Sequence, residues 1–242
     1  MFNKNQTINV QNSLYALGIT ALGLFIIPES AQALTVINQT NFTDTDFNQQ
    51  ITDKKFSELF VAEGRIGGKA TYELSINDDV LKGATPVTKE EFNWKSGEKY
   101  DFSLEYDGSM VNYILGGKTL KSTNFKGSIN SIFFRTSAWQ NTTTALTDLM
   151  FNGGAIGSLT SNLNDSRDID YLQLKNISSP FKITGKASMS WTGTAPKNSQ
   201  NAFQIKVGNS PKRKVPEPGT TGAIFLTGMT GLGLSKKKKQ EA

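Results

Sequence analysis

The sequence contains no cysteine and no histidine among its 242 residues. The lack of cysteine excludes disulfide bonds, thiol nucleophiles and cysteine-ligated metals within the chain. The lack of histidine excludes a catalytic triad with an imidazole base and removes the usual nitrogen ligand of zinc sites.

An excess of charge of one sign is also missing from the body of the chain. The formal net charge is +5, from 26 Lys and Arg against 21 Asp and Glu. Setting aside the residues outside 34–235 leaves 21 basic and 19 acidic residues, a net charge of only +2. Because basic and acidic residues are nearly equal in number, this part of the chain does not have the charge of a nucleic-acid surface, and we expect no nucleic-acid partner. The 37% hydrophobic content is that of a globular protein.

The N-terminus carries the features of an export signal. The uncharged apolar segment 14–27 would reach about 21 Å as a helix, short of a hydrocarbon core of about 30 Å. A proline follows, and the small residues Ala31 and Ala33 match the −3 and −1 positions that signal peptidase reads. We expect residues 1–33 to be a signal peptide, with Leu34 as the new N-terminus. An uncleaved N-terminal anchor is the alternative.

The C-terminus combines a proline motif, a short apolar segment and a basic end. Proline lacks an amide donor and keeps the preceding residue extended, a shape that a processing enzyme can grip. The Gly-rich segment 220–235 would span about 24 Å as a helix, marginal for a membrane, and the basic end would stay cytoplasmic. The motif is Val215, Pro216, Glu217 and Pro218, and the basic end is Lys236, Lys237, Lys238 and Lys239.

This tail resembles the PEP-CTERM sorting signal of bacteria that make extracellular polysaccharide. In that family a membrane protease-transpeptidase, the exosortase, recognises the Pro-Glu-Pro motif, which is carried here by Pro216, Glu217 and Pro218. The resemblance implies processing by exosortase at the cytoplasmic membrane and a final location at the cell surface or in the extracellular matrix. A plain C-terminal membrane anchor, or a proline-rich linker beside an apolar stretch, is the alternative.

The body of the chain has the sequence pattern of β-sheet. No long apolar stripe of period 3.6 occurs over residues 34–210, whereas alternation of period two is frequent. It is clearest over residues 181–192, where Gly185 interrupts the apolar row and indicates a bulge or bend. Many short strands with Gly-rich turns predict an all-β fold, a jelly-roll-like β-sandwich. Further strands are expected near 129–136, 147–152 and 168–176, with a short helix over 142–149 as an option.

A hairpin is predicted around the Asp-Gly pair at 107–108. A two-residue type I′ loop pairs positions whose numbers add up to 215, which places Leu104 opposite Val111 and Phe102 opposite Tyr113. One face of this hairpin is then apolar and the other mostly polar, as a sheet with one solvated side requires. A slip by one residue would destroy the match.

The remaining segments complete the expected domain organisation. Residues 34–55 are polar and predict a loosely held N-terminal arm before a β-sandwich ectodomain over 56–208. Residues 209–219 predict a linker that contains the Pro-Glu-Pro motif. We expect a transmembrane sorting helix over 220–235 and a basic cytoplasmic tail over 236–242.

The downstream body is also similar to a family, the choice-of-anchor ectodomains, with the W type nearest. These are compact exported domains, many of them cyanobacterial, that occur with PEP-CTERM or other anchors. The resemblance covers about residues 56–208 and implies a fold and an exported location, but no catalytic residues, because that family has no established activity. It is carried by INSIFFRTSAWQ near 130–140, TDLMFNG at 147–153, DIDYLQL at 168–174, FKITGKASMSWTGTAP at 181–196 and AFQIKVG at 202–208.

Glycoside hydrolysis by two carboxylates is the enzyme hypothesis that the sequence leaves open. Asp168 and Asp170 share one face of a predicted strand, but Gln173 occupies the position of the acid/base residue. Because an amide cannot donate and recover a proton, the decisive step lacks its group. We therefore expect no enzymatic activity, with a carboxylate-dependent glycoside hydrolase as the least favoured alternative.

Candidate binding residues are few. Trp139 and Trp94 are candidates for a platform on which sugar rings stack, with extracellular polysaccharide as the ligand. No cofactor is expected, although Asp165, Asp168 and Asp170 could supply oxygen ligands for Ca²⁺. The function predicted from the sequence is non-enzymatic work at the cell surface in association with exopolysaccharide. A structural coat or adhesion protein is the alternative.

Overall fold

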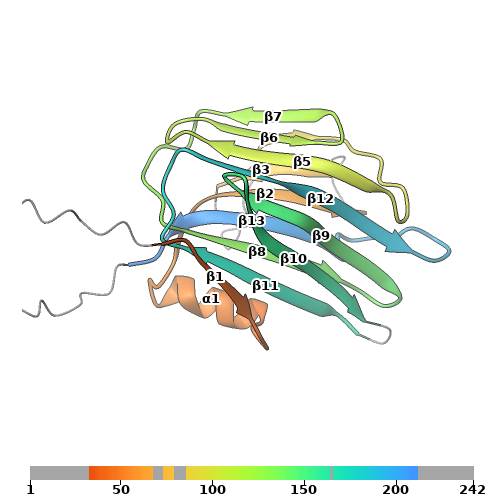
Figure 1. Cartoon of the computed structure of the whole chain (residues 1–242). Helices are drawn as coiled ribbons and strands as arrows, with labels where there is room; N and C mark the ends of the chain where they lie inside the picture. The colour runs from red at the N-terminus through yellow and green to blue at the C-terminus, as the bar shows by residue number, and fades with distance from the viewer. Residues whose placement is uncertain (1–32, 68–72, 79–85, 164–165, 212–242) are drawn as a thin grey trace, which may run out of the picture. The chain divides into compact units, whose positions relative to one another are not determined.

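A computed structural model describes residues 33–67, 73–78, 86–163 and 166–211. Within these residues the chain forms two antiparallel sheets and one short helix, α1 (Asp44–Thr52), as Figure 1 shows. The first sheet has the strand order β1 (Thr35–Gln39), β11 (Asp168–Lys175), β8 (Ser131–Ala138), β13 (Asn201–Asn209), β2 (Ser57–Ile66), β3 (Leu74–Asn77) and β4 (Pro86–Glu90). The second has the order β10 (Gly154–Leu163), β9 (Thr142–Phe151), β12 (Phe181–Trp191), β5 (Lys99–Tyr106), β6 (Val111–Leu115) and β7 (Lys118–Ser122). The predicted all-β sandwich is confirmed.

The core lies between the two sheets and is built by alternation along each strand. In β12, Ile183, Ala187 and Met189 are buried, as the apolar row of the sequence predicts. Phe102 of β5 meets Phe203 of the other sheet with ring centroids 6.2 Å apart. Burial of each large apolar side chain stabilises the fold by about 1.5–3 kcal/mol. This shared core holds the two sheets together.

The bulge predicted at Gly185 is present. The pairing of β12 with β9 shifts register between Thr184 and Lys186. A Cβ at Gly185 would lie 2.9 Å from side-chain carbons of both Leu149 and Phe102. Glycine therefore lets β12 bend while the neighbouring core side chains pack against its backbone.

The β5–β6 hairpin forms, but the predicted register is wrong by two residues. Phe102 pairs with Leu115 and Leu104 pairs with Tyr113, so that paired numbers add up to 217. The loop has four residues because Asp107 Oδ1 accepts hydrogen bonds from the backbone N–H groups of Ser109 (2.8 Å) and Met110 (2.7 Å). A slip of two residues keeps every side chain on its face, so the apolar pattern could not exclude it.

The expectation of a loose N-terminal arm over 34–55 is also wrong. Strand β1 adds to the edge of the seven-stranded sheet beside β11. Helix α1 begins at a capping box formed by Thr43 and Asp46 and packs Phe47 onto the outer face of that sheet. A second, smaller cluster of buried rings results: Phe47, Phe56, Phe133 and Tyr171. Ile51 of the same helix packs against this cluster, so two apolar residues and a capping box dock a helix that is otherwise polar.

The optional helix over 142–149 does not form, and this segment belongs to strand β9. Its residues pair with β10 on one side and with β12 on the other. The run Thr142 to Thr144 is β-branched and suits a strand better than a helix. The strands expected near 129–136, 147–152 and 168–176 correspond to β8, β9 and β11.

The described chain begins and ends at the same end of the sandwich, on the left in Figure 1. Asn176 Nδ2 donates to the carbonyl of Ala33 (3.3 Å), and the next residue, Ile177, donates its backbone N–H to the carbonyl of Asn130 (3.4 Å). Asn130 in turn exchanges two hydrogen bonds of 2.7 Å with the backbone of Ser210. We call this end, with the turns at 107–110, 123–130, 152–153 and 176–180, the terminal pole. The opposite end, with the turn at 139–141 and the loop 192–200, is the distal pole.

Candidate functional site

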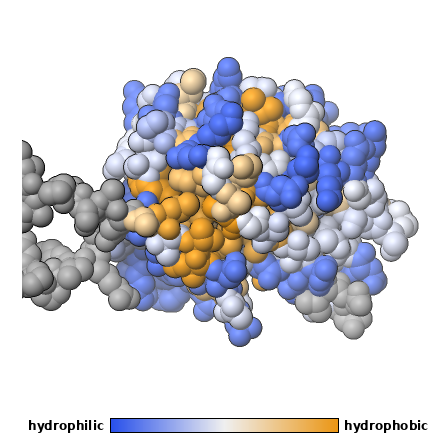
Figure 2. Space-filling view, in the orientation of Figure 1, coloured by the Kyte–Doolittle hydropathy of each residue, from blue (hydrophilic) through white to orange (hydrophobic). Residues whose placement is uncertain are grey.

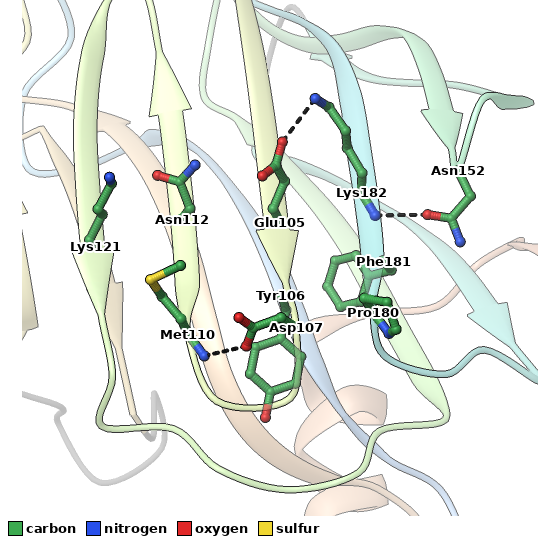
Figure 3. Close-up of a pocket in the computed structure, with 10 residues that line it drawn as sticks. All are labelled: Glu105, Tyr106, Asp107, Met110, Asn112, Lys121, Asn152, Pro180, Phe181 and Lys182. Carbon is green, nitrogen blue, oxygen red and sulfur yellow. Dashed lines mark hydrogen bonds and ion pairs between the residues drawn. The ribbon is translucent and has the colours of Figure 1, made fainter.

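A row of polar side chains crosses the outer face of the six-stranded sheet near the terminal pole. The strand register places Lys121 of β7 beside Asn112 of β6, Asn112 beside Glu105 of β5, and Glu105 beside Lys182 of β12. Each residue belongs to the solvent-facing set of its strand, because residues of one face alternate with core residues. Figure 3 shows the four side chains projecting from neighbouring strands.

This row forms part of the wall of an open groove of about 570 Å³. The groove continues past Met110 in the β5–β6 turn to Pro180 and Asn152 in the turns beside β12 (Figure 3). The described residues that line it are Glu105, Tyr106, Asp107, Met110, Asn112, Lys121, Asn152, Pro180, Phe181 and Lys182. Four neighbouring strands and three turns therefore contribute to one concave surface.

Two of the charged residues that line the groove, Glu105 and Lys182, form an ion pair with each other. Lys182 Nζ lies 2.8 Å from Glu105 Oε1, and the hydrogen bond from Lys182 is the main reason that the pKa of Glu105 is lowered. The Asp107 carboxylate accepts the backbone bonds of its own turn, which lower its pKa. By contrast, Lys121 forms no ion pair with any described carboxylate, and Asn112 Oδ1 is buried without a hydrogen-bond partner in the described structure.

The groove offers apolar surface only through flexible or small side chains. Met110 is 40% exposed, whereas Tyr106 and Phe181 are buried in the core and present no ring face to solvent. A sugar that stacks on an aromatic ring therefore finds no platform here. A free lysine beside an exposed methionine instead forms a small amphipathic surface.

Trp139 lies at the distal pole, in the turn between β8 and β9. It is 37% exposed, and among the exposed large hydrophobic side chains of the described residues it is the one aromatic. The turn is held by the backbone N–H of Thr142, which donates to the Trp139 carbonyl (3.0 Å), and by Asn141 in the left-handed region at φ 56°. Thr142 Oγ1 also donates to Asn201 Oδ1 at 2.9 Å, which ties the turn to β13. The indole thus stands on a fixed support, surrounded by polar side chains.

Trp94 does not share this exposure, and the structure removes it as a binding candidate. It is 5% exposed and packs edge to face against Phe92 and Tyr100, with ring centroids 4.8 and 5.5 Å away. Its indole N–H donates to the backbone carbonyl of Arg65 at 3.0 Å. Because its polar group is satisfied and its rings are covered, Trp94 is a core residue.

Asp168 and Asp170 lie side by side at the start of β11, as their spacing predicts. Ser161 Oγ donates to Asp170 Oδ2 (2.8 Å), and the backbone N–H of Asn162 donates to Asp168 Oδ2 (2.8 Å). Burial raises the pKa of Asp170, and the neighbouring Asp168 raises it further. Both carboxylates therefore fasten β10 to β11.

The structure brings no further acid to this pair. Among the described residues no group of three or more acidic side chains is placed to hold a metal ion, and Asp165, the third predicted Ca²⁺ ligand, lies outside these residues. Gln173 points to the opposite face of β11, where its Nε2 donates to Ser131 Oγ at 3.0 Å. The carboxylate pair thus lacks even an amide at the acid/base position of the hydrolase hypothesis.

The sorting residues lie almost entirely outside the described part of the chain. Ala33 and Leu34 are described, whereas Ala31 and all residues from 212 onward are not, including the motif at 215–218 and the lysines at 236–239. Among the described residues no helix is both long and apolar enough to cross a membrane. The segments 14–27 and 220–235 fall outside that search.

No protein-family model matches the chain, and no curated protein is significantly similar to it.

The groove was not foreseen from the sequence. The polar face of the hairpin with Glu105 and Asn112 was visible in the alternation, but the flanking lysines come from β7 and β12. Only the strand order places Lys121 and Lys182 beside that face.

Proposed function

We propose that this chain is an exported, non-enzymatic protein of the cell surface or extracellular matrix that associates with extracellular polysaccharide. Support for export comes from the two ends of the sequence, an N-terminal signal with Ala31 and Ala33 and a C-terminal tail with the Pro-Glu-Pro motif at 216–218. The proposed body is a jelly-roll-like ectodomain between a signal peptide and a transmembrane sorting helix. Signal peptidase and exosortase are its processing partners, and the cytoplasmic membrane holds it before the final cut.

The polysaccharide site is assigned to the distal pole, and one observation carries this assignment. Trp139 presents an exposed indole on a turn held by Thr142 and Asn201, at the end of the sandwich opposite to Ala33 and Ser210. An aromatic face stacks on the apolar face of a pyranose ring, and neighbouring polar side chains bind its hydroxyls. A precursor held in the membrane through its chain ends would present this pole to the extracellular matrix.

A structural coat or adhesion protein is the second candidate, favoured by the open edge at β1. Among the described strands, β1 pairs with β11 alone, and Val36 on it is 41% exposed. An edge strand with an exposed apolar side chain can pair with a strand of another protein. This candidate predicts protein–protein contacts rather than glycan binding.

Glycan-array binding by the exported protein, compared with Trp139→Ala, tests the proposal. We expect the wild type to bind at least one polysaccharide and the variant to lose most of that signal, because the substitution removes the aromatic face on which the sugar ring stacks. Met110→Ala is the matched control, because Met110 is similarly exposed but lies at the terminal pole. An array without any signal would favour the coat or adhesion protein, and turnover of a polysaccharide by the protein would overturn the non-enzymatic assignment.

A further inference from the structure

Exposed apolar side chains gather near the terminal pole. Leu34 and Val36 lie at the start of β1, Met110 lies in the β5–β6 turn, and Met150 lies near the end of β9. Figure 2 shows apolar surface beside the point where the described chain begins. Among the exposed large hydrophobic side chains of the described residues, only Trp139 lies at the other pole. The exposed apolar side chains are therefore concentrated at one end of the sandwich rather than spread over one of its faces.

Lysines that form no ion pair within the described part of the chain surround the same pole. Lys54 follows α1 next to the start of β2, Lys126 lies in the turn 123–130, and Lys175 ends β11 opposite Thr35. These three lysines, together with Lys121 in the groove, make no ion pair with any described carboxylate. Lys54, Lys121 and Lys126 are exposed, and Lys175 is half-buried.

The acidic groups of the pole do not cancel this charge. Asp53 pairs with Lys55 at 2.8 Å, which leaves that pair neutral. The carboxylate of Asp107 accepts hydrogen bonds from Ser109 and Met110 and stays charged, with a lowered pKa. Among the described residues, these four lysines outnumber Asp107 and Asp78, the residue after β3, so this end is cationic, and its exposed apolar side chains make it amphipathic as well.

The chain itself keeps this pole near the membrane of the precursor. Six residue steps separate Ile27, the end of the first apolar segment, from Ala33, and nine separate Pro211 from Thr220 at the start of the second. Even a fully extended chain covers only about 3.5 Å per residue, so these tethers reach at most about 21 and 32 Å. Tethers of this length allow the pole to come within about one Debye length of the membrane, roughly 8 Å, the range over which an anionic surface attracts lysines.

We propose that the terminal pole is a membrane-contact surface that binds anionic phospholipid headgroups. Lys54, Lys126 and Lys175 bind the headgroup phosphates, and Leu34 and Met110 enter the apolar side of the interface. The proposal rests on the membrane-inserted precursor of the proposed function. It adds an orientation, because the sandwich then stands on its terminal pole with Trp139 facing outward. The contact ends when the tail is cut and the lysines lose their tether.

Residue-resolved lysine labelling tests this contact with the full chain reconstituted into vesicles. The vesicles contain phosphatidylcholine alone or phosphatidylcholine with phosphatidylglycerol, and a water-soluble acetylating reagent reports the accessibility of each lysine by mass spectrometry. We expect labelling of Lys54, Lys126 and Lys175 to fall about fivefold on the anionic vesicles. Lys95 and Lys197 at the distal pole serve as internal controls and should label equally on both kinds of vesicle.

Charge reversal supplies the second measurement. In the variant Lys54→Glu/Lys126→Glu/Lys175→Glu, protection of the remaining Lys121 should be lost, whereas Lys95→Glu/Lys197→Glu should retain it. Equal labelling of the pole on both vesicles would overturn the proposal. Protection that appears on neutral vesicles only when soluble polyuronate is added would also overturn it, and would assign the lysines to acidic polysaccharide. Loss of glycan binding with intact protection would instead remove only the function assigned to Trp139.

Discussion

Asp44 and Arg135, 91 residues apart in the sequence, form a two-point ion pair that fastens the start of α1 to the middle of the seven-stranded sheet. Arg135 Nε donates to Asp44 Oδ1 at 2.6 Å and Arg135 Nη2 donates to Oδ2 at 2.8 Å. The hydroxyl of Tyr171 donates to Oδ1 as well, at 2.7 Å. Because the guanidinium is almost fully buried, Asp44 is the counterion that makes its burial tolerable.

Removal of this counterion should destabilise the fold strongly. Asp44→Asn keeps the shape of the side chain but leaves the buried Arg135 without its main negative partner. Uncompensated buried charges of this kind cost about 3–5 kcal/mol, and we expect the free energy of unfolding in urea to fall towards that range. Asp53→Asn is the control, because its exposed pair with Lys55 should contribute less than about 1 kcal/mol. Equal effects of both substitutions would contradict this account.

The same pair predicts how stability depends on acid pH. Burial by itself would raise the pKa of Asp44, but the hydrogen bonds and charge of Arg135 outweigh it and lower the pKa from 3.8 to about 2. A carboxyl with a lowered pKa in the folded state stabilises the fold fully above pH 3.8, and this contribution is lost as the pH falls towards 2. We expect wild-type stability, measured by urea unfolding, to drop by up to about 2 kcal/mol in this window. Asp44→Asn should lack this part of the drop, and an unchanged acid profile in the variant would contradict the assignment.

Gly185 offers a test of packing at the bulge of β12. Gly185→Ala would place a methyl carbon 2.9 Å from Leu149 Cδ2 and from Phe102 Cε1, and 3.0 Å from the Thr147 carbonyl oxygen. Such overpacking costs about 1–3 kcal/mol, which a lower melting temperature would report. Gly154→Ala is the matched control, since its Cβ would meet nothing closer than 3.5 Å. It should change stability by no more than about 0.5 kcal/mol.

Processing is tested by the intact mass of the exported protein. We expect a species that begins at Leu34 and ends near Pro218, after cuts by signal peptidase and exosortase. Replacing Pro216 and Pro218 by Ala restores backbone freedom to the motif, so uncut precursor should accumulate in the membrane. Exchange of Lys212 and Arg213 for Ala, just upstream, is the control and should leave the cut intact. A wild-type species that still ends at Ala242 in cells with a working exosortase would reduce the tail to an ordinary membrane anchor.

The two tryptophan candidates show why the fold could be predicted from the sequence more readily than the candidate site. Both Trp94 and Trp139 stand in polar stretches, so their surroundings in the sequence look alike. Trp94 is covered by Phe92 and Tyr100 and donates to a carbonyl 29 residues away, whereas no aromatic ring of the described residues packs against Trp139, which is 37% exposed. Exposure of a single ring depends on contacts from distant strands, which no local pattern encodes.

By itself, the sequence determined what is local in this protein. The alternation of apolar and polar residues in β5, β6 and β12 was sufficient to predict strands and to assign each side chain to the core or to solvent, because the two faces of a strand repeat every second residue. It left the β5–β6 register open by two residues, since that slip preserves the faces and only the hydrogen bonds of Asp107 select the longer turn. The tertiary structure alone decided that α1 docks through Asp44 and Arg135 and that Lys121 and Lys182 flank one groove. It also decided that Ala33 and Ser210 lie at the same pole. These relationships join residues far apart in the chain, and their partners are chosen by packing and charge once the sheets have formed.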